Sequence, residues 1–156
     1  MPTHAERQIV PYRPDQLFDL VADVDKYPQF LPWCVAARIR SRTERELVAD
    51  LTIGFGPFRE NFTSYVTLER PQRVKVCYGR GPFRYLNNQW EFHAHPQGTE
   101  LDFFVDFEFH SRILQAAIGV VFNEAVRRMV AAFRRRARDV YGPPLVPAGT
   151  PSPAST

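Results

Sequence analysis

Residues 101–109 read LDFFVDFEF, and the chain continues from there into HSRILQAAIGVVFNEAVRRMVAAFRRRARDVY, residues 110–141. Every second residue of the first stretch is apolar, and three acidic residues stand between them. A period of two is typical of a strand with one buried face. The second stretch carries apolar residues at helical spacing and predicts a long helix from about Ser111, a suitable N-cap, to about Tyr141.

The same alternation recurs upstream in five further stretches, and a short first strand is predicted over residues 5–10. The five apolar rows are Val35–Ile39, Leu47–Phe55, Phe62–Leu68, Val74–Tyr78 and Leu86–Phe92. Short links that contain Gly or Pro follow each row from Leu47–Phe55 onward. Consecutive strands joined by such links should pair antiparallel, because parallel pairing needs a long crossover.

Another helix is predicted from Pro14, because Pro suits the first helical position. We expect Tyr27-Pro28 to stop it, since the residue before Pro is pushed out of the α region. The order is then strand, helix, six strands and long helix. This order predicts an α+β fold in which a curved seven-stranded antiparallel sheet covers its apolar face with the long C-terminal helix.

The bulk properties indicate a single domain. The chain has 156 residues and a formal charge of +3, and its last stretch, residues 142–156, is rich in Pro, Ser and Thr. We therefore expect a domain over residues 1–141 and a disordered tail over 142–156. Neither a signal peptide nor a membrane span is apparent, and Cys34 and Cys77 make no disulfide framework. A cytoplasmic protein with peripheral membrane contact is expected.

The sequence lacks the motifs of familiar catalytic chemistry. It has no acyl-transfer elbow, no phosphate-binding Gly loop and no zinc motif. His93 and His95 would share a strand face, but no third ligand accompanies them, and Cys34 fits packing as a small hydrophobe. We therefore predict a binding protein with neither catalytic residues, nor a metal, nor a cofactor.

The aromatic content is high, with thirteen Phe, six Tyr and two Trp. Such side chains fill a closed core or line a cavity equally well. Ser64, Asn88 and Tyr78 interrupt or end the apolar rows, where either internal partners or a ligand head would satisfy them. An aromatic-lined cavity with a few polar groups suits a long-tailed amphiphile, since each buried methylene contributes about 0.8 kcal/mol.

Two stretches, YPQFLPWC at residues 27–34 and LNNQWEF at 86–92, resemble the coenzyme Q-binding START-like family. The resemblance covers residues 3–141. It implies a helix-grip fold of the START/Bet v 1-like type and binding of ubiquinone or a related isoprenoid lipid. It further implies a carrier that supports respiratory electron transport. The family includes bacterial ribosome association toxins, and its polyketide cyclase-like description comes from fold relatives.

On this reading, the isoprenoid tail lies between the sheet and the last helix, and the quinone oxygens accept hydrogen bonds from Ser64, Asn88 or Tyr78. The predicted ligand-binding residues are Leu31, Trp33, Leu51, Ile53, Phe62, Ser64, Val66, Tyr78, Asn88, Trp90, Phe103, Phe107, Ile113, Ala117, Val121 and Met129.

An exposed segment around Phe30, Leu31 and Trp33, with the first half of the last helix, is expected to form the mouth and touch an anionic membrane. Two alternatives stay open. One is a ribosome-binding regulator of subunit association that contacts rRNA through Arg127, Arg128, Arg134 and Arg135. The other is a cyclase-like enzyme that acts on an aromatic polyketide.

Overall fold

A computed structural model describes residues 3–31, 33–55 and 57–143, with the side chains of this part except those of residues 55, 80, 121 and 123. Seven antiparallel strands form one sheet in the order β1-β7-β6-β5-β4-β3-β2. The strands are β1 (Thr3–Val10), β2 (Cys34–Arg42), β3 (Glu46–Phe55), β4 (Phe58–Glu69), β5 (Arg73–Arg80), β6 (Phe83–His95) and β7 (Gly98–Phe109). Each row of alternating apolar residues thus lies within a strand, and the predicted α+β fold is confirmed.

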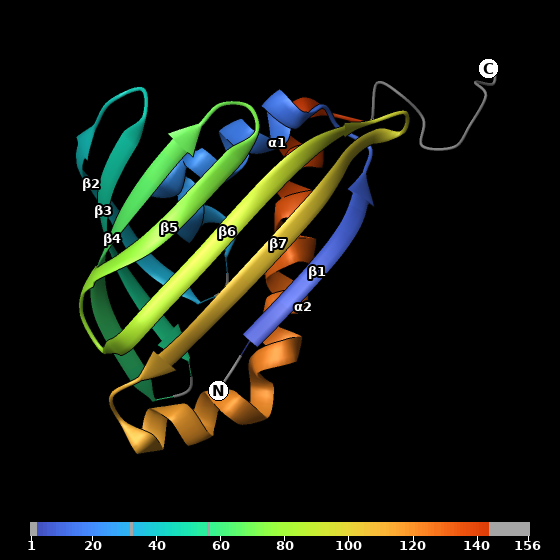
Figure 1. The fold of residues 1–156 in the computed structure, drawn as a ribbon. Coiled ribbons are helices and arrows are strands. Elements are labelled where there is room, and N and C mark those ends of the chain that lie inside the picture. Colours follow the sequence, from blue (N-terminus) through green and yellow to red (C-terminus); the bar gives the residue numbers. More distant parts are fainter. Residues whose placement is uncertain (1–2, 32, 56, 144–156) are drawn as a thin grey trace.

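The sheet curves around the long helix α2 (Arg112–Tyr141), which runs behind it in Figure 1. Alternate residues of β7 from Leu101 to Phe109 are buried, as the period of two predicted. Between them, the acidic residues of β7 point to the opposite face of the sheet. The apolar face of the sheet therefore meets α2, and the gripped helix expected from the sequence is confirmed.

The helix that follows β1 is shorter than expected. Helix α1 (Pro14–Ala22) does begin at Pro14, but its C-cap Asp23 leaves the helical region at φ −85° and ψ 64°. The chain then forms a 3₁₀ helix, η1 (Val24–Gln29), with Pro28 inside it. The prediction that Tyr27-Pro28 stops a single helix is wrong.

Helix α2 has the ends that the sequence predicted. The Ser111 hydroxyl accepts a hydrogen bond from the Leu114 N–H at 3.2 Å, which is the N-cap interaction. The helix stops at Tyr141, where Gly142 takes a positive φ of 79°. The predicted disordered tail lies outside the described residues from position 144 onward. Among the helices in the described ranges, none combines the length and apolar content that crossing a bilayer requires.

The course of α2 is bent. In Figure 1 its first turns, coloured orange, run across one end of the sheet before the helix turns to run behind it. Gly119 lies in this first part, and a Cβ added there would meet no atom within 4 Å. Glycine lowers the cost of such a change of direction. The bend lets one helix both cover an end of the sheet and fill its concave face.

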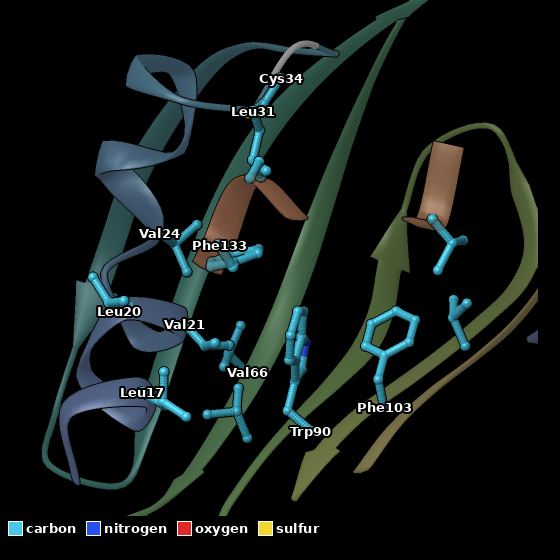
Figure 2. Packing of buried hydrophobic residues seen from close by; sticks show 14 of the residues in the cluster. Leu17, Leu20, Val21, Val24, Leu31, Cys34, Val66, Trp90, Phe103 and Phe133 are labelled. Carbon is cyan, nitrogen blue, oxygen red and sulfur yellow. The ribbon is translucent and has the colours of Figure 1, made fainter. Parts of the chain in front are cut away.

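The core joins α1 and η1 to the sheet and to α2. Figure 2 shows Leu17 and Val21 of α1 and Val24 of η1 pointing toward the space that Trp90 and Phe133 share. All five side chains are buried. Burial of such side chains contributes roughly 1.5–3 kcal/mol each, so α1 is part of the same core as the sheet and α2.

Candidate functional site

A cavity of about 290 Å³ lies between the concave face of the sheet and α2. Strands β2 to β7 supply one wall, and α1, η1 and α2 supply the others. Its position follows from the curvature of the sheet, because a curved sheet and a bent helix diverge between their points of contact. The residues that line this cavity are therefore the candidate ligand-binding residues.

Most of the residues that the sequence predicted to bind a ligand lie on this wall. They are Leu31, Trp33, Leu51, Ile53, Phe62, Ser64, Val66, Asn88, Trp90, Phe103, Phe107 and Met129. The alternation of each strand determined which of its residues face inward, so the sheet side of the cavity was predictable. Their role toward a ligand remains a prediction.

Four predicted residues do not join them. Tyr78 and Ala117 are partly buried but do not line the cavity, and Ile113 points into solvent with 72% of its surface exposed. The Tyr78 hydroxyl accepts a hydrogen bond from the Phe83 N–H at 3.1 Å, so it serves the β5–β6 connection. The side chain of Val121 lies outside what the structure describes. The α2 residues were misplaced because the inward row of this helix runs through Leu114, Ile118, Phe122 and Val126, one position along from the predicted row.

Apart from Met129, sequence reasoning missed the helical side of the cavity. Val21, Val24 and Tyr27 reach it from α1 and η1, while Phe122 and Phe133 reach it from α2. Their apolar spacing was visible in the sequence, and it indicated buried helix faces. Tertiary packing decides which part of a buried helix face lines the cavity and which part packs against other side chains.

The segment around Phe30, Leu31 and Trp33, predicted to form the mouth of the cavity, is more buried than expected. Leu31 is only 5% exposed, and Phe30 packs edge-on against Phe133 with ring centroids 5.1 Å apart. The guanidinium of Arg136 covers the other side of Phe30 at 5.1 Å. The expectation of an exposed segment is therefore wrong for Leu31, while Phe30 and Trp33 are half-buried.

Polar groups on the wall already have partners inside the protein. The Asn88 amide donates to the Phe104 carbonyl at 2.8 Å and accepts from the Trp90 indole N–H at 3.0 Å. The Ser64 hydroxyl, 1% exposed, donates to the Ala49 carbonyl at a long 3.4 Å. One amide N–H of Asn88 and the weakly bonded Ser64 hydroxyl remain the donors nearest to a ligand head.

Two side chains on the described part of the wall are titratable, Tyr27 and Cys34. Burial raises the pKa of the Cys34 thiol to about 11. Burial also raises the pKa of Tyr27, whose hydroxyl donates to the Val21 carbonyl. Both groups are therefore protonated and neutral at pH 7, and neither is a base there.

His93 and His95 do not act together. His93 lies 3.3 Å from a carboxylate oxygen of Glu91 and from one of Asp102, while His95 Nδ1 accepts from the Gln97 N–H at 3.0 Å. Glu91, His93 and Asp102 are close enough to hold a cation. However, Arg7 binds the same Asp102 at 2.8 Å, and the cluster lies on the sheet face opposite the cavity. The cluster of Glu91, His93 and Asp102 therefore does not line the cavity.

Residues 10–134 match the family model described as polyketide cyclase/dehydrase and lipid transport. The chain is 42% identical to the ribosome association toxin RatA of Rickettsia prowazekii, over 85% of this chain and 94% of that protein. It is 33% identical to the coenzyme Q-binding protein COQ10 homolog B, mitochondrial, of Xenopus laevis, over 92% of this chain and 61% of that protein.

Solved structures agree. The solution structure of an 18 kDa protein from Caulobacter crescentus is 34% identical, with a TM-score of 0.74, and the match covers 92% of this chain and all of that one. An aromatase/cyclase from Streptomyces sp. R1128 has a TM-score of 0.77 at 16% identity, covering 89% and 95% of the two chains, and so shows the fold alone. The chain belongs to the polyketide cyclase/dehydrase and lipid transport family, with the START-like fold and the relatives that its sequence indicated.

Proposed function

We propose that this protein binds ubiquinone or a related isoprenoid lipid in the cavity and carries it in support of respiratory electron transport, without catalysing a reaction. The observation that carries the proposal is the composition of the wall, which is almost entirely aliphatic and aromatic. Such a wall favours an apolar molecule through burial alone. The name of the Xenopus laevis relative, a coenzyme Q-binding protein, supports this choice of ligand.

The polar groups of the wall would orient the head of the ligand. A quinone carbonyl accepts hydrogen bonds, and the free amide N–H of Asn88 and the Ser64 hydroxyl are donors. The second N–H of Asn88 can add a bond to the ligand, whereas the single Ser64 O–H would exchange its long bond to the Ala49 carbonyl for one to the ligand. Both side chains have partners in the protein when the ligand departs. Apolar contact would then supply most of the affinity.

The size of the cavity limits how much of the lipid it can enclose. At about 290 Å³ it lies near the lower end of the ~300–1,000 Å³ that small-molecule pockets span. A long polyprenyl tail would exceed this space, so we expect the head and the first isoprene units inside and the rest of the tail beyond the rim.

The protonation states of the titratable side chains on the wall favour a carrier over an enzyme. Proton transfer at neutral pH needs a group with a pKa near 7. Tyr27 and Cys34 are both shifted upward and so stay protonated. The likeness to an aromatase/cyclase is one of fold and carries no residue role.

Intrinsic fluorescence can test the proposal, because both tryptophans of the chain, Trp33 and Trp90, line the cavity. A short-tailed ubiquinone analogue should quench them in a saturable titration. Ala125→Phe places a ring in the cavity and should weaken binding by at least about tenfold. Ala131→Phe, on the exposed side of the same helix, is the matched control and should bind normally. Equal affinity of the two variants would rule out the cavity as the site.

Ribosome binding is the second candidate, because relatives of this chain are named ribosome association toxin. The Arg127 and Arg128 side chains on α2 are 62% and 70% exposed, although both pair with Glu124. Arg135 is exposed as well, and Arg134 donates to Gln8. Under this proposal the chain co-sediments with ribosomal subunits, and binding falls steeply with salt. Replacing Arg127 and Arg135 with Ala should weaken it, and unchanged co-sedimentation would exclude this face.

A further inference from the structure

The first turns of α2 are apolar on two sides. Residues 113–123 contain no charged side chain. Ile118 and Phe122 line the cavity on one side. On the other side, Ile113 is 72% exposed and Val120 is 86% exposed, and Ala116 between them is exposed too. The helix therefore presents a continuous apolar strip to solvent, spaced i, i+3, i+7.

Such an apolar strip is unusual on the solvent-exposed face of a surface helix. A surface helix normally keeps its apolar residues on the face toward the core. After residue 123 most exposed positions of α2 carry charges, among them Glu124, Arg127 and Arg128, and the exposed apolar residues Ala131 and Val140 stand singly. The change of composition coincides with the part of α2 that crosses the end of the sheet (Figure 1). An apolar surface at this place indicates an apolar partner.

Three features favour a lipid bilayer as that partner. The strip lies on the same turns as Ile118 and Phe122, so whatever covers it also lies beside the cavity. The strip is flanked by the exposed Arg112 at one end and by Glu124 with its two partners Arg127 and Arg128 at the other. Three arginines against one carboxylate leave this border net positive, and anionic headgroups attract such side chains. Figure 1 shows these turns at the end of the sheet away from α1.

We propose that Ile113, Ala116 and Val120 form a docking surface that inserts into the interface of an anionic bilayer and places the cavity beside the membrane. The inference rests on the proposed function for its purpose, because a cavity that takes an isoprenoid lipid must exchange it with a membrane. Apolar side chains enter the boundary of headgroups and acyl chains, while the flanking arginines remain among the phosphates.

Vesicle co-sedimentation of the full chain tests this surface. The probes are vesicles of phosphatidylcholine with phosphatidylglycerol, and vesicles of phosphatidylcholine alone. The wild type should bind the anionic vesicles more strongly. The double variant Ile113→Gln/Val120→Gln, which adds no charge to exposed sites, should bind them roughly tenfold more weakly. Val140→Gln, at a 50% exposed site near the other end of α2, is the matched control and should bind normally.

The outcomes separate docking from ligand binding. The double variant should still take up the short-tailed quinone from solution, since neither residue lines the cavity. Vesicle binding that depends on the strip supports docking even where the quinone titration fails. Equal vesicle binding by the double variant and the wild type would overturn it. So would a dimer in solution that the double variant abolishes, because the strip would then be covered by a second copy.

Discussion

The indole of Trp90 packs against the ring of Phe133 with centroids 5.0 Å apart and an angle of 66° between the planes. Trp90 stands on β6 and Phe133 on α2, so this contact joins the sheet to the helix that it grips. Phe133 also packs against Tyr27 at 5.5 Å, and Trp90 against Phe103 at 4.7 Å. These rings form a wall of the cavity and at the same time hold its elements together.

Phe133→Ala should therefore lower the free energy of unfolding by about 3–5 kcal/mol, as truncation of a buried Phe does. Phe133 is 5% exposed and contacts the rings of Tyr27, Phe30 and Trp90, so the space left behind cannot close easily. Urea denaturation measures the change. Val140→Ala on the same helix should shift stability by less than about 0.5 kcal/mol. A similar small effect of Phe133→Ala would mean that the ring cluster is not essential to the fold.

Cys34 should resist alkylation at neutral pH. Its pKa is raised to about 11, and only the thiolate is nucleophilic, so its reaction with iodoacetamide should accelerate about tenfold per pH unit up to that pH. A Cys77→Ser background removes the exposed thiol, and mass spectrometry follows the remaining one. Bound quinone should slow the reaction further, because Cys34 lines the cavity. Rapid labelling of Cys34 at pH 7 would contradict the buried placement.

Two glycines should respond to Ala in opposite directions. Gly119→Ala should raise the free energy of unfolding by about 0.5–1 kcal/mol, because its new Cβ meets open space and Ala favours a helix. Gly98→Ala should lower it, since Gly98 has φ +129° and its Cβ would lie 2.4 Å from the Val10 carbonyl. Thermal unfolding compares the pair. Destabilisation by Gly119→Ala would show that the bend in α2 requires glycine at this position.

The affinity for quinones should depend on tail length only over the first isoprene units. Each methylene that enters the cavity contributes about 0.8 kcal/mol, and carbons beyond the rim contribute far less. A series of ubiquinone analogues titrated by tryptophan fluorescence should therefore reach a plateau. Affinity that keeps rising with every added unit would show that the space available exceeds the 290 Å³ of the cavity.

The sheet and its inward residues could be predicted from the sequence because alternation settles both. Leu51, Ile53 and Phe62 lie on the cavity wall where the period of two placed them. Ser111 and Tyr141 likewise mark the ends of α2. These features depend on local patterns, and local patterns survive in the folded chain.

The helical half of the cavity could not be predicted in the same way. Periodicity identified an apolar stretch at residues 113–122, but not which of its sides meets the sheet, and Ile113 is 72% exposed. The segment around Phe30, Leu31 and Trp33 was expected to be exposed, yet Leu31 is buried. Both errors concern contacts between distant segments, which no local pattern records.

Mass spectrometry of the organic extract from protein purified out of its native host tests the central claim most directly. The proposal predicts an isoprenoid quinone at a nearly stoichiometric amount, and the Ala125→Phe variant should carry much less of it than Ala131→Phe. An extract free of quinone from the wild type, or equal amounts from the two variants, would contradict carriage in this cavity.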